Sequence, residues 1–182
     1  AGNSIYINDH YKKNDWVELY NTTGEDIDVN GMFLSDDRSN PQKYQISAEG
    51  SMASTIIPAY GRMIVWCDKL TPINQLHAPF KLDNADGAYV TLQAEDGTWS
   101  DEMEYLEQNR WQTYGRYPDG GQHSSYQSRP SIALPNVMGV YDFASENTPC
   151  WGDSLMAITL GLQQGWNWVS HNLASKVHAS RF

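Results

Sequence analysis

The sequence is poor in positive charge and in long apolar runs, and both shortages exclude classes of function. Only 12 Lys and Arg residues stand against 22 Asp and Glu, which gives a net charge of −10. No basic stripe is present to neutralise a phosphate backbone, so we exclude nucleic acid as a partner. An anionic membrane surface is disfavoured for the same reason. No apolar run reaches the length of a spanning helix, so we expect no membrane insertion.

Cysteine is also scarce, and the two residues present do not decide the redox compartment. Cys67 falls in an apolar segment, whereas Cys150 lies in a connector flanked by Pro and Gly. We expect Cys67 to be a buried free thiol, because unpaired cysteine behaves as a small hydrophobic residue. Whether the two residues are bonded to each other stays open.

Helical periodicity is hard to find, and alternation of apolar and polar residues recurs instead. The run 15–20 alternates, and 62–67 is apolar on both faces, as in a central strand. The clearest hairpin spans 88–105, where Asp96-Gly97 supplies the positive φ of a tight turn. By contrast, 124–135 is polar and bounded by proline, so we expect an extended surface stretch there. Together these patterns predict an all-β fold with two packed antiparallel sheets.

The alternation also predicts which side chains form the core and where the domain ends. We expect a sandwich over 1–143, a linker at 144–154 and, at 155–182, a fragment of a following β-domain or a docking hairpin. Apolar residues within 155–173 predict a hairpin that docks on the sandwich or pairs with a second copy, which gives a homodimer. The residues expected in the core are Val17, Leu19, Leu34, Val65, Val90 and Leu92.

Several segments in order resemble the lamin-tail domain family. The sequence DWVELYNTT at 15–23 and IDVNGMFLSDD at 27–37 are similar to its opening strands, and LHAPFKL at 76–82 and YGRYPDG at 114–120 continue the match. The resemblance implies an immunoglobulin-like sandwich without catalytic residues. Secreted bacterial members accompany hydrolases, kinase-like domains or adhesive modules. The tail at 155–173 more weakly resembles the opening hairpin of another secreted bacterial β-domain.

No motif for catalysis or for a cofactor is present. The five histidines show no His-x-x-x-His spacing, and Cys-x-x-Cys, Gly-x-Ser-x-Gly and phosphate loops are absent from the sequence. We therefore predict no enzyme, no cofactor and no metal, with surface positions as the default for the histidines. Asp36-Asp37, 83–86 and Asp119 are the best acidic loops for calcium, but Asp and Asn favour turns without a metal.

Aromatic residues are the remaining lead for binding. Trp111, Tyr114, Tyr117 and Tyr126 cluster in a stretch rich in Gly and Gln. Planar rings beside amides stack on sugars or anchor a protein partner. The alternative is that the rings close one end of the sandwich.

The function expected from these observations is a non-catalytic interaction or spacer module of a larger secreted or cell-surface bacterial protein. One alternative is a carbohydrate-binding module. Another is an accessory domain of a secreted hydrolase or kinase-like protein whose catalytic part lies elsewhere. Each version places the chain outside the cytoplasm, with a protein or glycan as the partner at the cell surface.

Overall fold

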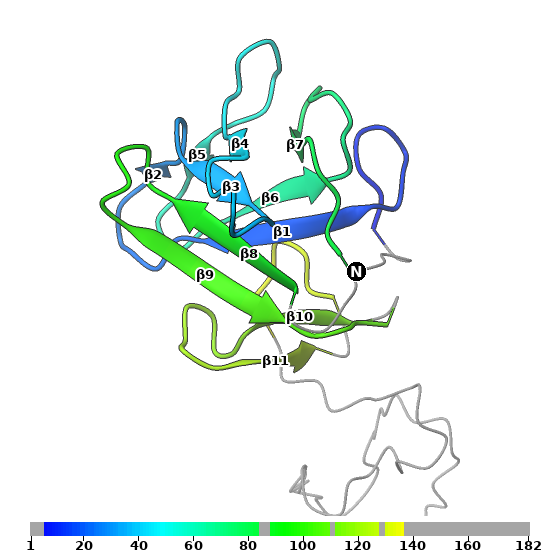
Figure 1. Ribbon diagram of the computed structural model, residues 1–182, viewed down its shortest axis with the longest axis vertical. Coiled ribbons are helices and arrows are strands. Elements are labelled where there is room, and N and C mark those ends of the chain that lie inside the picture. Colours follow the sequence, from blue (N-terminus) through cyan, green and yellow to red (C-terminus); the bar gives the residue numbers. More distant parts are fainter. Residues whose placement is uncertain (1–5, 84–87, 110–111, 128–129, 137–182) are drawn as a thin grey trace, which may run out of the picture. The chain divides into compact units, whose positions relative to one another are not determined.

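The computed structural model describes residues 6–83, 88–109, 112–127 and 130–136. The chain divides into two units, Ala1–Cys150 and Trp151–Phe182, and every described residue belongs to the first. All regular elements among the described residues are β-strands, which confirms the all-β class (Figure 1). The expected linker, C-terminal hairpin and dimer contact lie outside the described residues. So do Trp111 and Cys150.

The strands form two larger sheets and two smaller pairs. Their orders are β1-β6-β7, β4-β3-β8-β9, β2-β5 and β10-β11. The strands are β1 (Asp15–Tyr20), β2 (Ile27–Asp28), β3 (Phe33–Ser35), β4 (Tyr44–Gln45), β5 (Ile56–Ile57), β6 (Arg62–Cys67), β7 (Leu76–Ala78), β8 (Ala88–Gln93), β9 (Ser100–Tyr105), β10 (Thr113–Arg116) and β11 (Ser124–Gln127).

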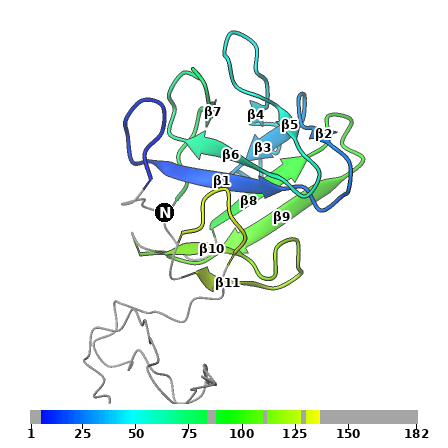
Figure 2. The same cartoon turned by 180° about the vertical axis from the view of Figure 1, so that it is seen from behind.

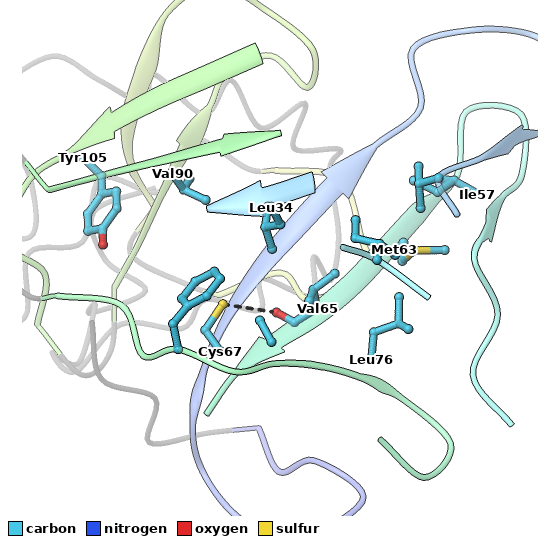
Figure 3. Close-up of a cluster of buried hydrophobic side chains, with 12 residues drawn as sticks. Leu34, Ile57, Met63, Val65, Cys67, Leu76, Val90 and Tyr105 are labelled. Atoms are coloured by element: carbon cyan, nitrogen blue, oxygen red, sulfur yellow. Dashed lines mark hydrogen bonds between the residues drawn. The ribbon is translucent and has the colours of Figure 1, made fainter. Parts of the chain in front are cut away.

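The core lies between the two larger sheets, in a sandwich-like arrangement. Figure 3 shows Leu34 and Val90 of the second sheet facing Val65 of β6. All three are buried, with exposed fractions of 1%, 7% and 0%, as predicted. Val17, Leu19 and Leu92 pack against this core but are only half-buried.

The register of β1 agrees with the sequence pattern. Val17 lies opposite Val65 of β6 and packs on the core. Trp16 contacts the rings of Trp66 and Tyr6 edge to face, with ring centroids 5.8 Å apart in each pair. Both faces of β1 are therefore covered in part, which explains why no residue of this strand is fully exposed.

The prediction that the sheets are antiparallel throughout is wrong at β7. This strand runs parallel to β6, with Val65 opposite Leu76. Because β7 is parallel to β6, the chain must run back to the starting end of β6 before β7 can begin. Segment 68–75 makes this connection. The carboxylate of Asp9 fastens the segment, because it accepts the backbone N–H groups of Asn74 and Gln75 at 2.8 and 3.0 Å.

The hairpin predicted at 88–105 is confirmed. β8 and β9 pair Val90 with Met103, and the turn between them places Gly97 at φ 71°. Positive φ is favourable for glycine because it has no Cβ.

An extended surface stretch was expected at 124–135, but its first four residues form β11. β11 pairs with β10 and places Tyr126 opposite Tyr114. The sequence signal was missed because the two strands are short and rich in Ser and Gly, which have low strand propensity.

Cys67 is a buried free thiol, as expected. Burial raises the pKa of this thiol well above its usual value, so it stays protonated. Across the described residues, no helix is long and apolar enough to cross a membrane.

Candidate functional site

A hollow of about 850 Å³ lies between β1, the β8–β9 hairpin and the β10–β11 hairpin. In both views, β10 and β11 lie below β1, on the same side of it as β9 (Figure 1, Figure 2). The volume falls within the range of about 300–1,000 Å³ that is usual for small-molecule sites. This hollow is the candidate functional site.

The wall of the hollow is largely apolar because it is built from the inward faces of the strands. Val17 and Leu19 of β1, Leu92 of β8 and Met103 of β9 all line it. These are side chains that pack against the core and yet remain half-buried. Their incomplete burial has a simple cause, since one side of each contacts the core and the other faces the hollow.

Gln127, at the end of β11, brings a polar group into this wall. Its side chain lines the hollow and is fully buried, with an exposed fraction of 0%. Neither Oε1 nor Nε2 has a hydrogen-bond partner among the described residues. A buried amide group left unpaired costs about 1–3 kcal/mol. Gln127 therefore places an unpaired amide, with two N–H donors on Nε2 and an acceptor at Oε1, in the wall of the hollow.

A largely buried ionic cluster lies at the edge of the same hollow. Arg62 of β6 pairs with Asp119, and its Nε lies 3.7 Å from Oε1 of Glu18. The guanidinium also lies over the ring of Tyr20, 4.5 Å from the centroid. The exposed fractions of the three charged side chains are only 11%, 13% and 18%. At this burial the carboxylates depend on Arg62 for charge compensation.

The two carboxylates also hold the segment that follows β11. Oε2 of Glu18 accepts the backbone N–H of Ala133 at 2.7 Å, and Oδ1 of Asp119 accepts that of Asn136 at 3.0 Å. Burial raises the pKa of Glu18, although the hydrogen bond from Ala133 and the charge of Arg62 oppose the rise. Both carboxylates are paired in this way and shape the wall of the hollow.

The structure brings together only part of the predicted aromatic cluster. Tyr114 lines the hollow and packs on the core. Its ring meets that of Tyr126 edge to face, with centroids 5.2 Å apart, and the Tyr126 hydroxyl donates to the carbonyl of Glu107 at 2.7 Å. Tyr117 is half-buried and is not among the lining residues. Trp111 lies outside the described residues.

The acidic loops considered for calcium are occupied by ordinary contacts where they are described. Asp36 pairs with Lys43 at 2.6 Å, and Asp37 accepts hydrogen bonds from the backbone and hydroxyl of Ser39. Asp119 belongs to the ionic cluster described above. These contacts are those expected of turn residues.

Sequence reasoning missed Gln127 and the partners of Arg62. Gln127 follows three polar residues in a stretch expected on the surface, and its burial depends on the pairing of β11 with β10. Arg62 and Asp119 are 57 residues apart. No local spacing could have joined them.

No protein-family model, curated protein or solved structure matches the chain. The likeness to lamin-tail domains therefore remains a prediction.

Proposed function

We propose that the chain is a non-catalytic binding module whose site is the hollow between β1, β8–β9 and β10–β11. The observation that carries the proposal is the fully buried amide of Gln127, which has no partner among the described residues and belongs to a largely apolar wall. A ligand with an adjacent donor and acceptor satisfies both atoms of this amide at once.

The charges around the hollow define the ligand further. The lining includes five acidic residues and two basic ones. A carboxylate head group would be repelled there, whereas a neutral primary amide pairs with Gln127 in a two-bond ring. We therefore propose a small, largely apolar ligand with an uncharged amide-like head group. The acidic residues are Asp15, Glu18, Asp101, Glu102 and Asp119, and the basic ones are Arg62 and Arg116.

The setting of this module belongs to the same proposal. The resemblance to lamin-tail domains supports an immunoglobulin-like sandwich within a larger secreted or cell-surface bacterial protein. The pairing of both carboxylates of the ionic cluster supports a non-catalytic role. Turnover of chromogenic hydrolase substrates above background by the purified chain would contradict that role.

The proposal is tested by titrating the full chain with a medium-chain primary amide, such as decanamide, and following heat or tryptophan fluorescence. Trp16 and Trp99 both line the hollow and serve as reporters. Gln127→Leu keeps the approximate volume and removes both polar atoms. We expect this variant to bind at least ~10-fold more weakly, since a lost hydrogen bond of about 1.4 kcal/mol gives that factor.

The stability of the same variant shows whether the amide of Gln127 serves ligand binding or the fold. Gln127→Leu should stabilise the free protein by about 1–3 kcal/mol, because it removes an unpaired buried amide. Gln122→Leu, at an exposed position in the loop between β10 and β11, is the matched control and should change neither quantity. Equal affinity of the Gln127→Leu variant for decanamide refutes the site. Saturable binding of oligosaccharides in place of the amide would favour the carbohydrate-binding alternative.

A further inference from the structure

A second cluster of polar side chains lies apart from the residues that line the hollow. Asp9 and His10 lie in the loop before β1, and His77 is the central residue of β7. One potential ligand atom from each of the three lies within 4.8 Å of those of the other two. Asp9 and His77 are 68 residues apart in sequence, so the fold alone brings them together.

His77 is oriented by a buried carboxylate. Its Nδ1 lies 2.9 Å from Oδ1 of Asp68, and both side chains have an exposed fraction of 0%. The second oxygen of Asp68 accepts the amide N–H groups of Asn8 and Asn14, each at 2.8 Å. Burial alone would raise the pKa of Asp68, but its hydrogen bonds outweigh burial and lower the pKa. The backbone N–H of Leu70 also donates to Asp68, so this carboxylate accepts on every side and Nδ1 of His77 donates to it. The lone pair of a neutral His77 ring then lies on Nε2.

That Nε2 faces a second anion. Oδ1 of Asp9 lies 2.8 Å from Nε2 of His77. The other oxygen of Asp9 accepts the backbone N–H groups of Asn74 and Gln75. Burial raises the pKa of Asp9, but these hydrogen bonds and His77 lower it overall. Nε2 of His77 and Oδ1 of Asp9 are thus close enough for one ion to contact both.

His10 brings a third potential ligand to the same place. Its Nε2 lies 2.8 Å from the carbonyl oxygen of Thr71. A carbonyl only accepts hydrogen bonds, so Nε2 carries the proton and a neutral ring has its lone pair on Nδ1. The rings of His10 and His77 meet edge to face, with centroids 5.2 Å apart. The second imidazole beside the His77–Asp9 pair completes a set of three donors for one metal ion.

The loop that holds Asp9 and His10 is fixed before any ion binds. Oδ1 of the buried Asn8 accepts the backbone N–H groups of His10 and Lys12 at 3.0 and 2.9 Å. The backbone N–H of Asp9 donates to Oε1 of Gln75 at 3.0 Å. The ligand atoms are thus held in place by the surrounding structure, as in built metal sites.

We propose that Asp9, His10 and His77 bind a zinc ion, with water at the fourth position. Two imidazole nitrogens and one carboxylate oxygen form a donor set that suits Zn²⁺. Asp68 and the carbonyl of Thr71 act as the outer partners that orient the two imidazoles. The ion joins the loop before β1 to β7. His10 is only half-buried, so the ion has access from solvent.

The test uses the full, untagged chain stripped with a chelator and titrated with ZnCl₂ by calorimetry, with metal content measured after dialysis. We expect saturable binding of one ion per chain and a rise in the melting temperature. Binding should weaken as pH falls, since protons compete with the metal for its ligands. Substitution with Co²⁺ should give the intense visible absorption of a four-coordinate site with nitrogen ligands.

His10→Gln is the decisive variant, because His10 lies at the edge of the cluster and its loss should leave the fold intact. We expect at least ~10-fold weaker zinc binding for it, as for other disturbed metal sites. His123→Gln, at an exposed position in the loop before β11, is the control and should bind like the parent chain. Asp9→Asn should weaken binding as well. The proposal is overturned if the folded parent chain binds no zinc, if His10→Gln binds equally well, or if Ca²⁺ and Mg²⁺ bind in preference.

Discussion

Arg62→Met is the substitution that tests the ionic cluster most directly. Methionine retains the apolar length of the side chain and removes the charge that Glu18 and Asp119 share. Breaking a buried ion pair by removal of one partner costs about 3–5 kcal/mol, because it leaves uncompensated buried charge. Exposed fractions of 11–18% across the cluster are small but not zero. We therefore expect a loss of about 3 kcal/mol, at the lower end of that range.

The loss should depend on pH in a defined direction. Burial already raises the pKa of Glu18 above its usual value of 4.5, and removal of Arg62 should raise it further. A carboxyl whose pKa is higher in the folded state destabilises the fold above that pKa. The penalty is relieved as pH falls through the folded pKa toward the unfolded value. Arg62→Met should therefore cost more stability at pH 8 than at pH 5.

Urea denaturation at both pH values measures these differences. Adding Glu18→Gln and Asp119→Asn to Arg62→Met should recover more than half of the lost stability, because neutral amides carry no charge to compensate. The control is Arg38→Met, since Arg38 and Glu104 form a pair with exposed fractions of 57% and 58%. Such surface pairs contribute about 0.2–1 kcal/mol. The reasoning fails if Arg62→Met costs no more than Arg38→Met, or if its cost does not change with pH.

Three further substitutions test single features of the fold by the same denaturation assay. Burial raises the pKa of Asp15 from 3.8 to about 6. The charged carboxylate therefore destabilises the folded state above pH 6, and this loss of stability disappears as pH falls toward 3.8. After allowance for solvent screening, Asp15→Asn should stabilise the protein by about 1–2 kcal/mol at pH 8 and by almost nothing at pH 4. Equal gains in stability at the two pH values would contradict this. Leu34→Ala should cost about 2–5 kcal/mol, since Leu34 has an exposed fraction of 1%, and a loss below 1 kcal/mol would show a loosely packed core. Gly97→Ala should cost about 1 kcal/mol because Gly97 has φ 71°, and an unchanged midpoint would mean that the turn relaxes.

The parts of the fold that could be predicted are those with a local signal. Alternation over six residues identified β1, and an Asp-Gly turn between two alternating runs identified the β8–β9 hairpin. β5 and β7 have two and three residues, too few for any periodicity to be recognised. The segment before β7 also donates hydrogen bonds to Asp9, which is distant from it in sequence, so no local pattern indicates the parallel pairing.

The candidate sites were harder to predict than the strands because their residues meet only in the folded chain. Tyr114 was identified from the aromatic cluster, and it does line the hollow. Gln127 carried no signal, since a glutamine in a polar stretch is usually exposed. The surface position expected for His77 is wrong, because His77 has an exposed fraction of 2% and lies between two carboxylates. A histidine within a three-residue strand gives no periodic pattern from which burial could be inferred.

The acidic composition has a structural meaning that net charge alone does not convey. Asp9 accepts two backbone N–H groups, and Glu18 and Asp119 accept one each. Each of these carboxylates therefore holds an irregular segment whose backbone groups have no strand to pair with. A chain with very short strands and long connections needs such acceptors, and carboxylates form stronger hydrogen bonds than neutral groups do. Part of the charge of −10 thus replaces sheet hydrogen bonding. For these three carboxylates, the backbone groups that each one accepts explain why an acidic residue occupies that position.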